Sequence, residues 1–328
     1  MQVYLLLTEK CNLDCRMCIR GSKNQIELSL SDLKNLNNLD GFENYDVVVT
    51  GGEPTLCKDF EPIIDFLSAR SKSVTVCTNG IKNNYITQEF FKKNISIQIS
   101  VDGTEKVHNY IRGNNTYSQT IETITKLEKL NIPYTIATVV SKKNVDCIFD
   151  LVSTLSSLQS LKHWSISYEM PFGTAGFNNM MTCKEWNDFV DELLDCVDFK
   201  LIVRKLFPFD LFEKYKNKLD TLLAGRTCYN CGSGKSKIYI YPDLTVYPCT
   251  CLTDFPIGNL KDDSLSNILN NSKCNIFSNY KVKVDSYCSN CEYLKFCNGG
   301  CIGMSYNYFK EIGCGDIRCP KLSKMIIK

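Results

Sequence analysis

The chain has 328 residues, of which 44% are hydrophobic, enough for one large core or for two domains. Its 38 basic and 36 acidic residues leave a formal net charge of +2, so the composition favours neither a nucleic acid nor a membrane as a partner. The first residues lack the basic start and the long apolar run of a signal peptide or membrane span, so we expect a cytoplasmic protein.

Cysteine is the most unusual feature of the composition. The chain has 19 cysteines and only 2 histidines, His108 and His163. An odd number of cysteines without a secretion signal argues against a disulfide framework. The scarcity of histidine argues against histidine-ligated zinc or haem and against a Ser-His-Asp triad. We therefore expect metal bound by thiolates, either as iron–sulfur clusters or as all-cysteine zinc.

Segments typical of strands alternate with segments typical of helices over residues 2–200. The strands are expected at 3–7, 46–50, 73–78, 95–100, 134–140 and 163–168. The helices are expected at 31–39, 59–69, 85–92, 116–130, 145–158 and 183–195. This alternation predicts a parallel sheet with right-handed crossovers. Six strand–helix units fall short of the eight of a closed barrel, so we expect a partial (β/α)6 TIM-like barrel.

The character of the chain changes after the last of these helices. From residue 228 onward cysteines are dense, and the expected strands are short with frequent turns. We expect the barrel over 1–205, a bridge over 206–227 and a small cysteine-rich α+β domain over 228–328. In the barrel, the turns GGEP, TNG and SVDG follow three of the strands. Ligands of parallel α/β folds lie at the C-terminal ends of the strands, so these turns are expected at one mouth.

A loop with three cysteines follows the first expected strand. In CNLDCRMC, Cys11, Cys15 and Cys18 have the spacing C-x3-C-x2-C. A [4Fe-4S] cluster normally takes four cysteines, so three leave one iron open to another ligand. The loop therefore indicates a cofactor site at which chemistry takes place. On the loop alone, a zinc knuckle or free thiols fit about equally well.

Together, CNLDCRMC, GGEP, TNG and SVDG resemble the motifs of radical S-adenosylmethionine enzymes. The resemblance implies that the three cysteines hold a [4Fe-4S] cluster whose open iron binds S-adenosylmethionine (SAM). It also implies that the GGEP turn receives the methionine amino group, that the TNG and SVDG turns lie near the ribose and the methionine, and that an arginine binds the carboxylate. The cofactor-binding candidates are then Gly51, Gly52, Glu53, Thr78, Asn79, Ser100, Asp102 and Arg112.

The C-terminal cysteines resemble a SPASM extension, which binds two auxiliary [4Fe-4S] clusters, so the whole chain would hold three clusters. The resemblance implies that one auxiliary cluster is held by Cys249, Cys301 and one or both of Cys228 and Cys231. It implies that the other is held by Cys288, Cys291, Cys297 and Cys319. A zinc ribbon is the alternative for these cysteines. Cys251, two residues past Cys249, is either a hydrogen-atom donor to a substrate radical or a bystander.

The activity that the resemblance implies is that of an oxidoreductase acting as a peptide maturase. SAM would supply a 5′-deoxyadenosyl radical that abstracts a hydrogen atom from a ribosomal peptide and installs a carbon–carbon or thioether crosslink. The expected partners are the peptide, an electron donor such as flavodoxin or ferredoxin, and a separate leader-binding protein. A formylglycine-forming sulfatase maturase is an alternative, although Thr250 follows Cys249 here, where sulfatase-maturing members usually have an aspartate. A peptide epimerase is another alternative, and a non-catalytic iron–sulfur carrier or zinc scaffold represents a different class.

Overall fold

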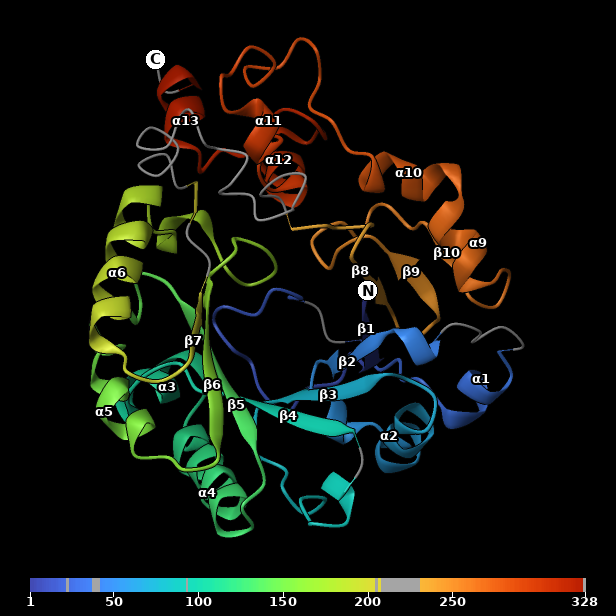
Figure 1. Ribbon diagram of the computed structural model, residues 1–328, viewed down its shortest axis with the longest axis vertical. Helices are drawn as coiled ribbons and strands as arrows, with labels where there is room; N and C mark the ends of the chain where they lie inside the picture. Colours follow the sequence, from blue (N-terminus) through green and yellow to red (C-terminus); the bar gives the residue numbers. More distant parts are fainter. Residues whose placement is uncertain (22–23, 37–41, 93, 204–205, 208–230, 327–328) are drawn as a thin grey trace.

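The computed structural model describes residues 1–21, 24–36, 42–92, 94–203, 206–207 and 231–326. Within these residues one sheet runs through the chain, in the strand order β10-β9-β8-β1-β2-β3-β4-β5-β6-β7. The sheet curves, and the loop that follows β1 crosses the space inside the curve (Figure 1). The sheet thus forms an open barrel wall with its N-terminal strand near the middle of the strand order.

The barrel strands agree closely with the apolar runs of the sequence. They are β1 Gln2–Thr8, β2 Asp46–Gly51, β3 Ser73–Thr78, β4 Ile95–Ser100, β5 Tyr134–Val140 and β6 Leu161–Tyr168. Each pairs in parallel with the next, so the expected parallel sheet and partial barrel are confirmed. A short further strand, β7 Leu201–Val203, pairs in parallel with β6. Its three residues were too few to recognise from the sequence.

The helices of this part lie along the outside of the curved sheet (Figure 1). Four of them follow the expected positions: α1 Leu30–Lys34, α2 Phe60–Ser68, α4 Thr116–Lys129 and α6 Cys183–Cys196. Helix α6 begins at a capping box, in which the Thr182 side chain accepts from Glu185 N and Glu185 accepts from Thr182 N. The expected helix at 145–158 is interrupted: a 3-10 turn over Val145–Cys147 precedes α5 Asp150–Ser156.

One expected helix is absent, and one helix was not expected. The segment 85–92 contains only the 3-10 turn Phe90–Lys92. Thr87 Oγ1 accepts from Phe90 N at 3.2 Å, the hydrogen bond of a helix N-cap, so only the end of the segment takes up a helical turn. Conversely, a helix not expected from the sequence, α3 Glu105–Arg112, follows β4. His108 lies inside α3 and is fully buried. Helix α3 is mostly polar, and its buried side is formed by His108, Ile111 and Arg112, so an apolar period could not reveal it.

The C-terminal part joins the same sheet. Its strand β8 Lys237–Ile240 pairs in parallel with β1, in the register Gln2 to Lys237. Strands β9 Thr245–Tyr247 and β10 Gly258–Asn259 then continue the sheet antiparallel. Five helices complete this part: α9 Leu265–Asn270, α10 Ser272–Ser278, α11 Leu294–Cys297, α12 Ile302–Phe309 and α13 Pro320–Ile326. The sheet therefore continues from the barrel into the cysteine-rich part.

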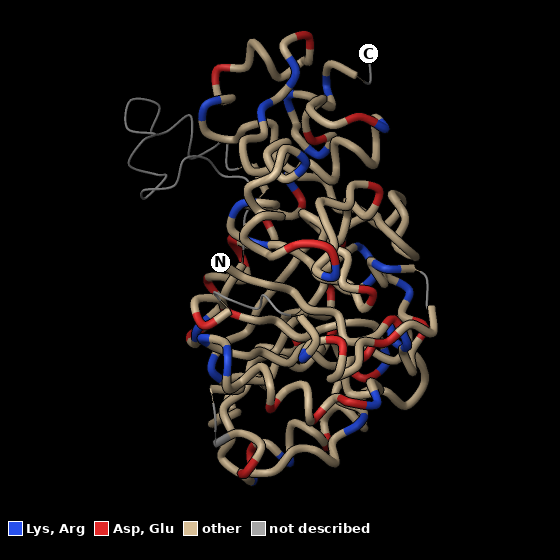
Figure 2. The backbone as a smooth tube through the Cα atoms, turned by 90° about the vertical axis from the view of Figure 1, so that its right-hand side faces the viewer, with Lys and Arg blue, Asp and Glu red and all other residues tan. Residues whose placement is uncertain are grey.

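The division at residues 206–227 stays a prediction, because only 206–207 of that bridge lie within the described residues. In the part of the chain that the structure describes, no helix has both the length and the apolar character needed to cross a bilayer. Lysine and arginine alternate with aspartate and glutamate over the face shown in Figure 2. The surface charge visible there is thus mixed in sign, in line with the small net charge of the chain.

Candidate functional site

The three-cysteine loop is held in place by neighbours on both sides of the barrel mouth. Arg16 N donates to the carbonyl of Ile111 at the end of α3, at 2.9 Å. On the other side, Thr174 N donates to the carbonyl of Cys18 at 2.9 Å, and Thr174 Oγ1 donates to that of Cys15 at 3.0 Å. Backbone bonds from two distant segments thus fix the path of the loop between α3 and the segment after β6.

Two glycines let the GGEP turn lie directly against the base of this loop. A Cβ on Gly51 would meet the carbonyl oxygen of Thr8 at 2.3 Å, and one on Gly52 would meet that of Lys10 at 2.2 Å. Instead, Gly52 N donates to Thr8 O and Glu53 N donates to Lys10 O, both at 2.8 Å. From the sequence we assigned these glycines to close approach of a ligand. The structure gives them a further role, which is to dock the end of β2 onto the cluster loop.

Glu53 joins the ends of β2 and β3. Its carboxylate, 1% exposed, accepts hydrogen bonds from Thr55 Oγ1 and Thr78 Oγ1, both at 2.7 Å, and from Asn79 N at 2.8 Å. Burial raises its pKa, and these donors oppose that rise. Asn79 in turn donates through Nδ2 to Asn12 Oδ1 of the cluster loop at 2.8 Å. The GGEP and TNG turns and the cluster loop therefore form one connected unit.

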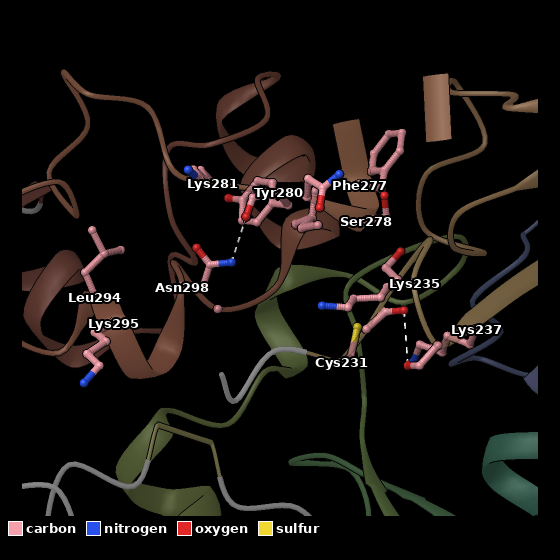
Figure 3. Close-up of a pocket in the computed structure, with 16 residues that line it drawn as sticks. Cys231, Lys235, Lys237, Phe277, Ser278, Tyr280, Lys281, Leu294, Lys295 and Asn298 are labelled. Carbon is pink, nitrogen blue, oxygen red and sulfur yellow. Dashed lines mark hydrogen bonds between the residues drawn. The ribbon is translucent and has the colours of Figure 1, made fainter. Parts of the chain in front are cut away.

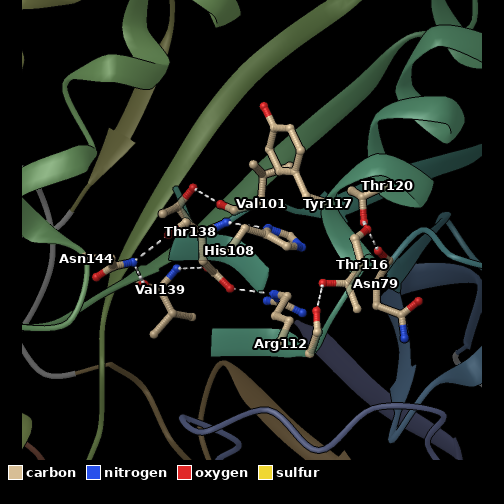
Figure 4. Close-up of polar contacts among 12 residues, drawn as sticks. Asn79, Val101, His108, Arg112, Thr116, Tyr117, Thr120, Thr138, Val139 and Asn144 are labelled. Atoms are coloured by element: carbon tan, nitrogen blue, oxygen red, sulfur yellow. Dashed lines mark hydrogen bonds and ion pairs between the residues drawn. The ribbon is translucent and has the colours of Figure 1, made fainter. Parts of the chain in front are cut away.

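Asp102 and Arg112 form a buried ion pair beside this unit. Arg112 Nε lies 2.5 Å from Asp102 Oδ2, and the other carboxylate oxygen accepts from Val139 N at 2.8 Å. His108 Nδ1 accepts from Asp102 N at 3.2 Å, and Figure 4 shows His108, Arg112 and Val139 gathered around this point. The resemblance assigns Asp102 and Arg112 to contacts with SAM, which stay a prediction; the structure shows in addition that their side chains pair with each other.

The charge of Arg112 also acts on the cluster loop. Burial raises the pKa of the Cys15 thiol to about 11, and the nearby Arg112 guanidinium opposes that rise. Burial opposes the positive charge of Arg112, but Asp102 and Cys15 outweigh it and raise the arginine pKa. Arg112 thus lies where it stabilises negative charge on the cluster thiolates as well as on Asp102.

Two residues at the mouth complete the site. Ser100 is half-buried at the end of β4, next to Ala137 of β5. Glu169, just past β6, forms a buried ion pair with Lys143, with Nζ and Oε1 2.9 Å apart. Lys143 Nζ also lies 3.5 Å from the carbonyl of Arg16 in the cluster loop. Sequence analysis missed Lys143, because it stands in an ordinary polar turn with no motif around it.

The first auxiliary cysteine set lies on one cavity. Cys231, Cys249 and Cys301 line a space of about 360 Å³, together with Cys251. The Cys231 and Cys249 thiols contribute to raising the pKa of Cys301, although burial is the main cause. Cys251 N donates to Cys249 Sγ at 3.4 Å. Cys228 lies outside the described residues, so its predicted place as a ligand stays a prediction.

The second auxiliary set adjoins the first, because Cys297 lines the same cavity as Cys249 and Cys301. Burial raises the pKa of Cys288 to about 11, with Cys319 and Cys291 adding to the rise. Burial likewise raises the pKa of Cys297 to about 12, with Cys319 and Cys288 among its neighbours. Because these four thiols influence one another's pKa, they lie near one another, as the resemblance requires of residues that hold one cluster. Every cysteine that the structure describes has a free thiol.

A buried ion pair supports the first auxiliary set. Arg318 donates to both oxygens of Asp316, through Nε at 3.0 Å and through NH2 at 2.6 Å. Asp316 Oδ2 also accepts from Cys301 N at 3.1 Å. The guanidinium reaches Met170 Sδ at 3.3 Å, past the end of β6. This pair links the auxiliary cysteines to the barrel mouth, and nothing in the local sequence around Cys314 and Cys319 indicated it.

The residues present fit iron–sulfur clusters. Three half-buried thiols on one loop beside an arginine suit an anionic cluster with an open position, and the auxiliary thiols surround a cavity or one another. In the described part of the chain, no three His, Cys, Asp or Glu side chains stand close enough together to hold a single metal ion.

Family comparisons agree with this architecture. Residues 5–155 match the model of the radical SAM superfamily, and residues 231–292 match that of an iron–sulfur cluster-binding domain, SPASM. The chain thus contains a radical SAM domain and a SPASM domain, for which SAM and iron–sulfur clusters are the implied cofactors.

Two relatives are maturation proteins by name. The chain is 31% identical over 154 residues to the sporulation killing factor maturation protein SkfB of Bacillus subtilis, covering 45% of this chain and 38% of SkfB. It is 32% identical over 152 residues to the mycofactocin maturase MftC of Mycolicibacterium smegmatis, covering 43% of this chain and 38% of MftC. The alignments thus span less than half of either relative.

A solved structure shares nearly the whole fold. The structure of Streptococcus suis SuiB bound to its precursor peptide SuiA superposes with a TM-score of 0.79 at 17% identity. The match covers 98% of this chain and 75% of SuiB. The barrel and the cysteine-rich part therefore keep the arrangement of a known radical SAM fold.

Proposed function

We propose that this chain is a radical SAM peptide maturase that installs a carbon–carbon or thioether crosslink in a ribosomal peptide. One observation carries the proposal. Ile19, which directly follows Cys18, lines the same 360 Å³ cavity as Cys249 and Cys301. A substrate in this cavity would lie between the three-cysteine loop and the first auxiliary set. The names of SkfB, MftC and SuiB with SuiA support a peptide as the substrate class.

Bound SAM supplies a 5′-deoxyadenosyl radical for hydrogen-atom abstraction. The side chains of the protein position the reactants and keep water out of the cavity. Arg112 balances the negative charge of the cluster thiolates, and Glu53 fixes the turns between which the amino group of SAM is expected. The apolar side chains of Tyr168, Met170 and Trp186 line the cavity and exclude water from it.

A crosslink is a net oxidation, so an electron must leave the substrate. Formation of one bond removes two hydrogens: one goes to the 5′-deoxyadenosyl radical as an atom, and the other leaves as a proton and an electron. Cys231, Cys249 and Cys301 stand beside the cavity, and a cluster on them would take that electron. We propose three [4Fe-4S] clusters in all, with the ligand sets given by the resemblance.

A basic hollow favours an acidic electron donor. Next to Cys231 is a space of about 890 Å³ lined by Lys235, Lys237, Lys281 and Lys295, and no Asp or Glu lines it in the described part of the chain. Several of these side chains are drawn in Figure 3. We propose that an acidic one-electron carrier such as flavodoxin or ferredoxin docks here. We also propose a separate leader-binding protein and a cytoplasmic setting, where thiols stay reduced.

The experiment incubates the reduced holoprotein with SAM and the peptide encoded beside its gene, under argon. A mass decrease of two hydrogens supports a crosslink. An unchanged mass in water with uptake of one deuteron in D2O would instead identify an epimerase that uses Cys251. Formation of an aldehyde from a cysteine or serine would identify a formylglycine-forming maturase. If the peptide is unchanged and no 5′-deoxyadenosine forms, the protein is an iron–sulfur electron carrier or a zinc scaffold.

A further inference from the structure

A second cavity lies between the cluster loop and the cysteine-rich part, with a volume of about 410 Å³. Its walls come from three places in the sequence. The two sides of the three-cysteine loop supply Glu9, Ile19, Arg20, Asn24 and Ile26. Phe172 and Gly173 follow β6, and the other lining residues lie between 241 and 253. Cys251 lines both this cavity and the one that contains the auxiliary cysteines. A molecule bound here would therefore adjoin the reaction site.

Two charged side chains in this cavity lack partners at a buried atom. Glu9 Oε2 and Arg20 NH1 are inaccessible to solvent and make no hydrogen bond in the part of the chain that the structure describes. Only three other buried side-chain nitrogen or oxygen atoms share this property there, and none belongs to a residue of this cavity: Tyr85 OH, His108 Nε2 and Tyr280 OH. Buried polar atoms of folded proteins are normally paired, so these two call for a ligand.

The remaining contacts hold Arg20 in a defined orientation. Its guanidinium carbon lies 5.6 Å from the centre of the Tyr241 ring, and that ring packs edge-on against Tyr247 at 4.8 Å. The other carboxylate of the cavity, Asp243, is already occupied, because it accepts from the backbone and the hydroxyl of Thr245 at 3.0 and 2.9 Å. Glu9 and Arg20 are thus the charged residues of this cavity that keep a buried atom unpaired, while Asn24, Thr250 and Thr253 add neutral polar groups to its lining.

The two atoms have opposite requirements. Glu9 Oε2 needs a donor and Arg20 NH1 needs an acceptor, in one cavity and without an ion pair between them among the described residues. An anion would meet Glu9 and a cation would meet Arg20, so either would gain one contact and suffer one repulsion. A neutral carboxamide has an N–H donor and a C=O acceptor in one plane and satisfies both.

We propose that this cavity is a substrate subsite that binds a carboxamide group of the peptide, through its N–H to Glu9 and its C=O to Arg20. The inference rests on the proposed function, because it takes the ligand to be a peptide. A carboxamide has two sources in a peptide: the backbone amide, and the side chain of asparagine or glutamine. In either case the subsite would fix the register of the substrate next to the cavity of the auxiliary cysteines.

The test measures binding of three blocked peptides to the holoprotein by saturation-transfer NMR. They are the N-methylamides acetyl-Gly-Asn-Gly-NHCH3, acetyl-Gly-Ala-Gly-NHCH3 and acetyl-Gly-Asp-Gly-NHCH3, in which the Asn side chain is the one primary carboxamide. Binding of the Asn peptide alone identifies a side-chain carboxamide, and equal binding of the Asn and Ala peptides identifies the backbone. In both cases we expect Glu9→Met and Arg20→Met each to weaken binding about tenfold, the effect of losing one hydrogen bond to a charged group.

Controls separate binding from folding. Lys184→Met, on the exposed face of α6, should leave binding unchanged. Should the Glu9 or Arg20 variant fail to fold, Thr253→Trp tests the same cavity from an exposed rim position, and we expect it to block binding. Tighter binding of the Asp peptide than of the Asn peptide would overturn the carboxamide assignment, and so would binding that all three variants leave intact.

The same samples distinguish this inference from the proposed function. SAM cleavage to 5′-deoxyadenosine is measured without any peptide. If 5′-deoxyadenosine forms but no peptide binds at millimolar concentration, the subsite is wrong and the radical chemistry stands. If the peptides bind as expected but SAM is not cleaved, the subsite stands and the proposed function fails.

Discussion

Replacing Asp102 by asparagine tests the buried ion pair at the barrel mouth. The Asp102 side chain is fully buried and that of Arg112 is 10% exposed, so the charge that remains on Arg112 would have little access to water. Asparagine also offers one oxygen in place of the two that now accept from Arg112 and Val139. Breaking a buried pair in this way costs about 3–5 kcal/mol.

The cost translates into a measurable shift in Tm. At about 2.1 cal/mol/K per residue, 328 residues give an unfolding entropy of about 0.7 kcal/mol/K. Asp102→Asn should therefore lower Tm by about 4–7 °C in anaerobic calorimetry of the holoprotein. Asp188→Asn is the matched control, because Asp188 is 61% exposed and pairs with Lys184, which is 85% exposed. That variant should change Tm by less than about 1 °C.

The outcome that would refute this reasoning is equal stability of the two variants. It would mean that Arg112 finds another anion when Asp102 is neutralised, the cluster thiolates at Cys15 being the nearest available. A double-mutant cycle with Arg112→Gln measures the coupling directly, and we expect the pair to be strongly non-additive.

Three further predictions follow from the same contacts. Gly52→Ala should lower the iron content by about four atoms per chain, because the added Cβ would clash with Lys10 O at the base of the cluster loop. Gly176→Ala is the control and should keep the full iron content, because the space around Gly176 is open. Burial lowers the pKa of His108 from 6.5 to about 4. The neutral side chain therefore contributes stability above pH 6.5 that is lost as the pH falls towards 4. His108→Gln should reduce the drop in Tm between pH 6.5 and pH 4. Lys235→Glu with Lys281→Glu should slow reduction by flavodoxin several-fold at low salt and leave reduction by dithionite unchanged.

The strands and the cluster motifs were accessible from the sequence because each is a local pattern. Apolar runs of five to seven residues specified β1 to β6, and the spacing of Cys11, Cys15 and Cys18 indicated the cluster loop. By contrast, the helix expected at 85–92 is reduced to the 3-10 turn Phe90–Lys92, which the Thr87 side chain caps by a hydrogen bond from Phe90 N. Periodicity is insensitive to such a bond.

The contacts between distant segments were not predictable from local pattern. The pairing of β8 with β1 joins residues more than 230 positions apart, and the resemblance gave no sign that Asp102 and Arg112 form a buried ion pair. Glu9 and Arg20 carry no motif, and their importance emerges only when the fold buries them in one cavity. Burial and partner choice depend on the whole fold, which explains why these features needed the structure.

The most direct test of the central claim is SAM cleavage by the reduced holoprotein under argon. The account predicts 5′-deoxyadenosine and methionine in equal amounts, detected by liquid chromatography and mass spectrometry. Cys15→Ala should abolish both products, because Cys15 is the proposed middle ligand of the three-cysteine loop, while Cys196→Ala, at an exposed position on α6, should leave them unchanged. Failure of the unmodified chain to form 5′-deoxyadenosine with its iron in place, or undiminished formation by Cys15→Ala, would contradict it.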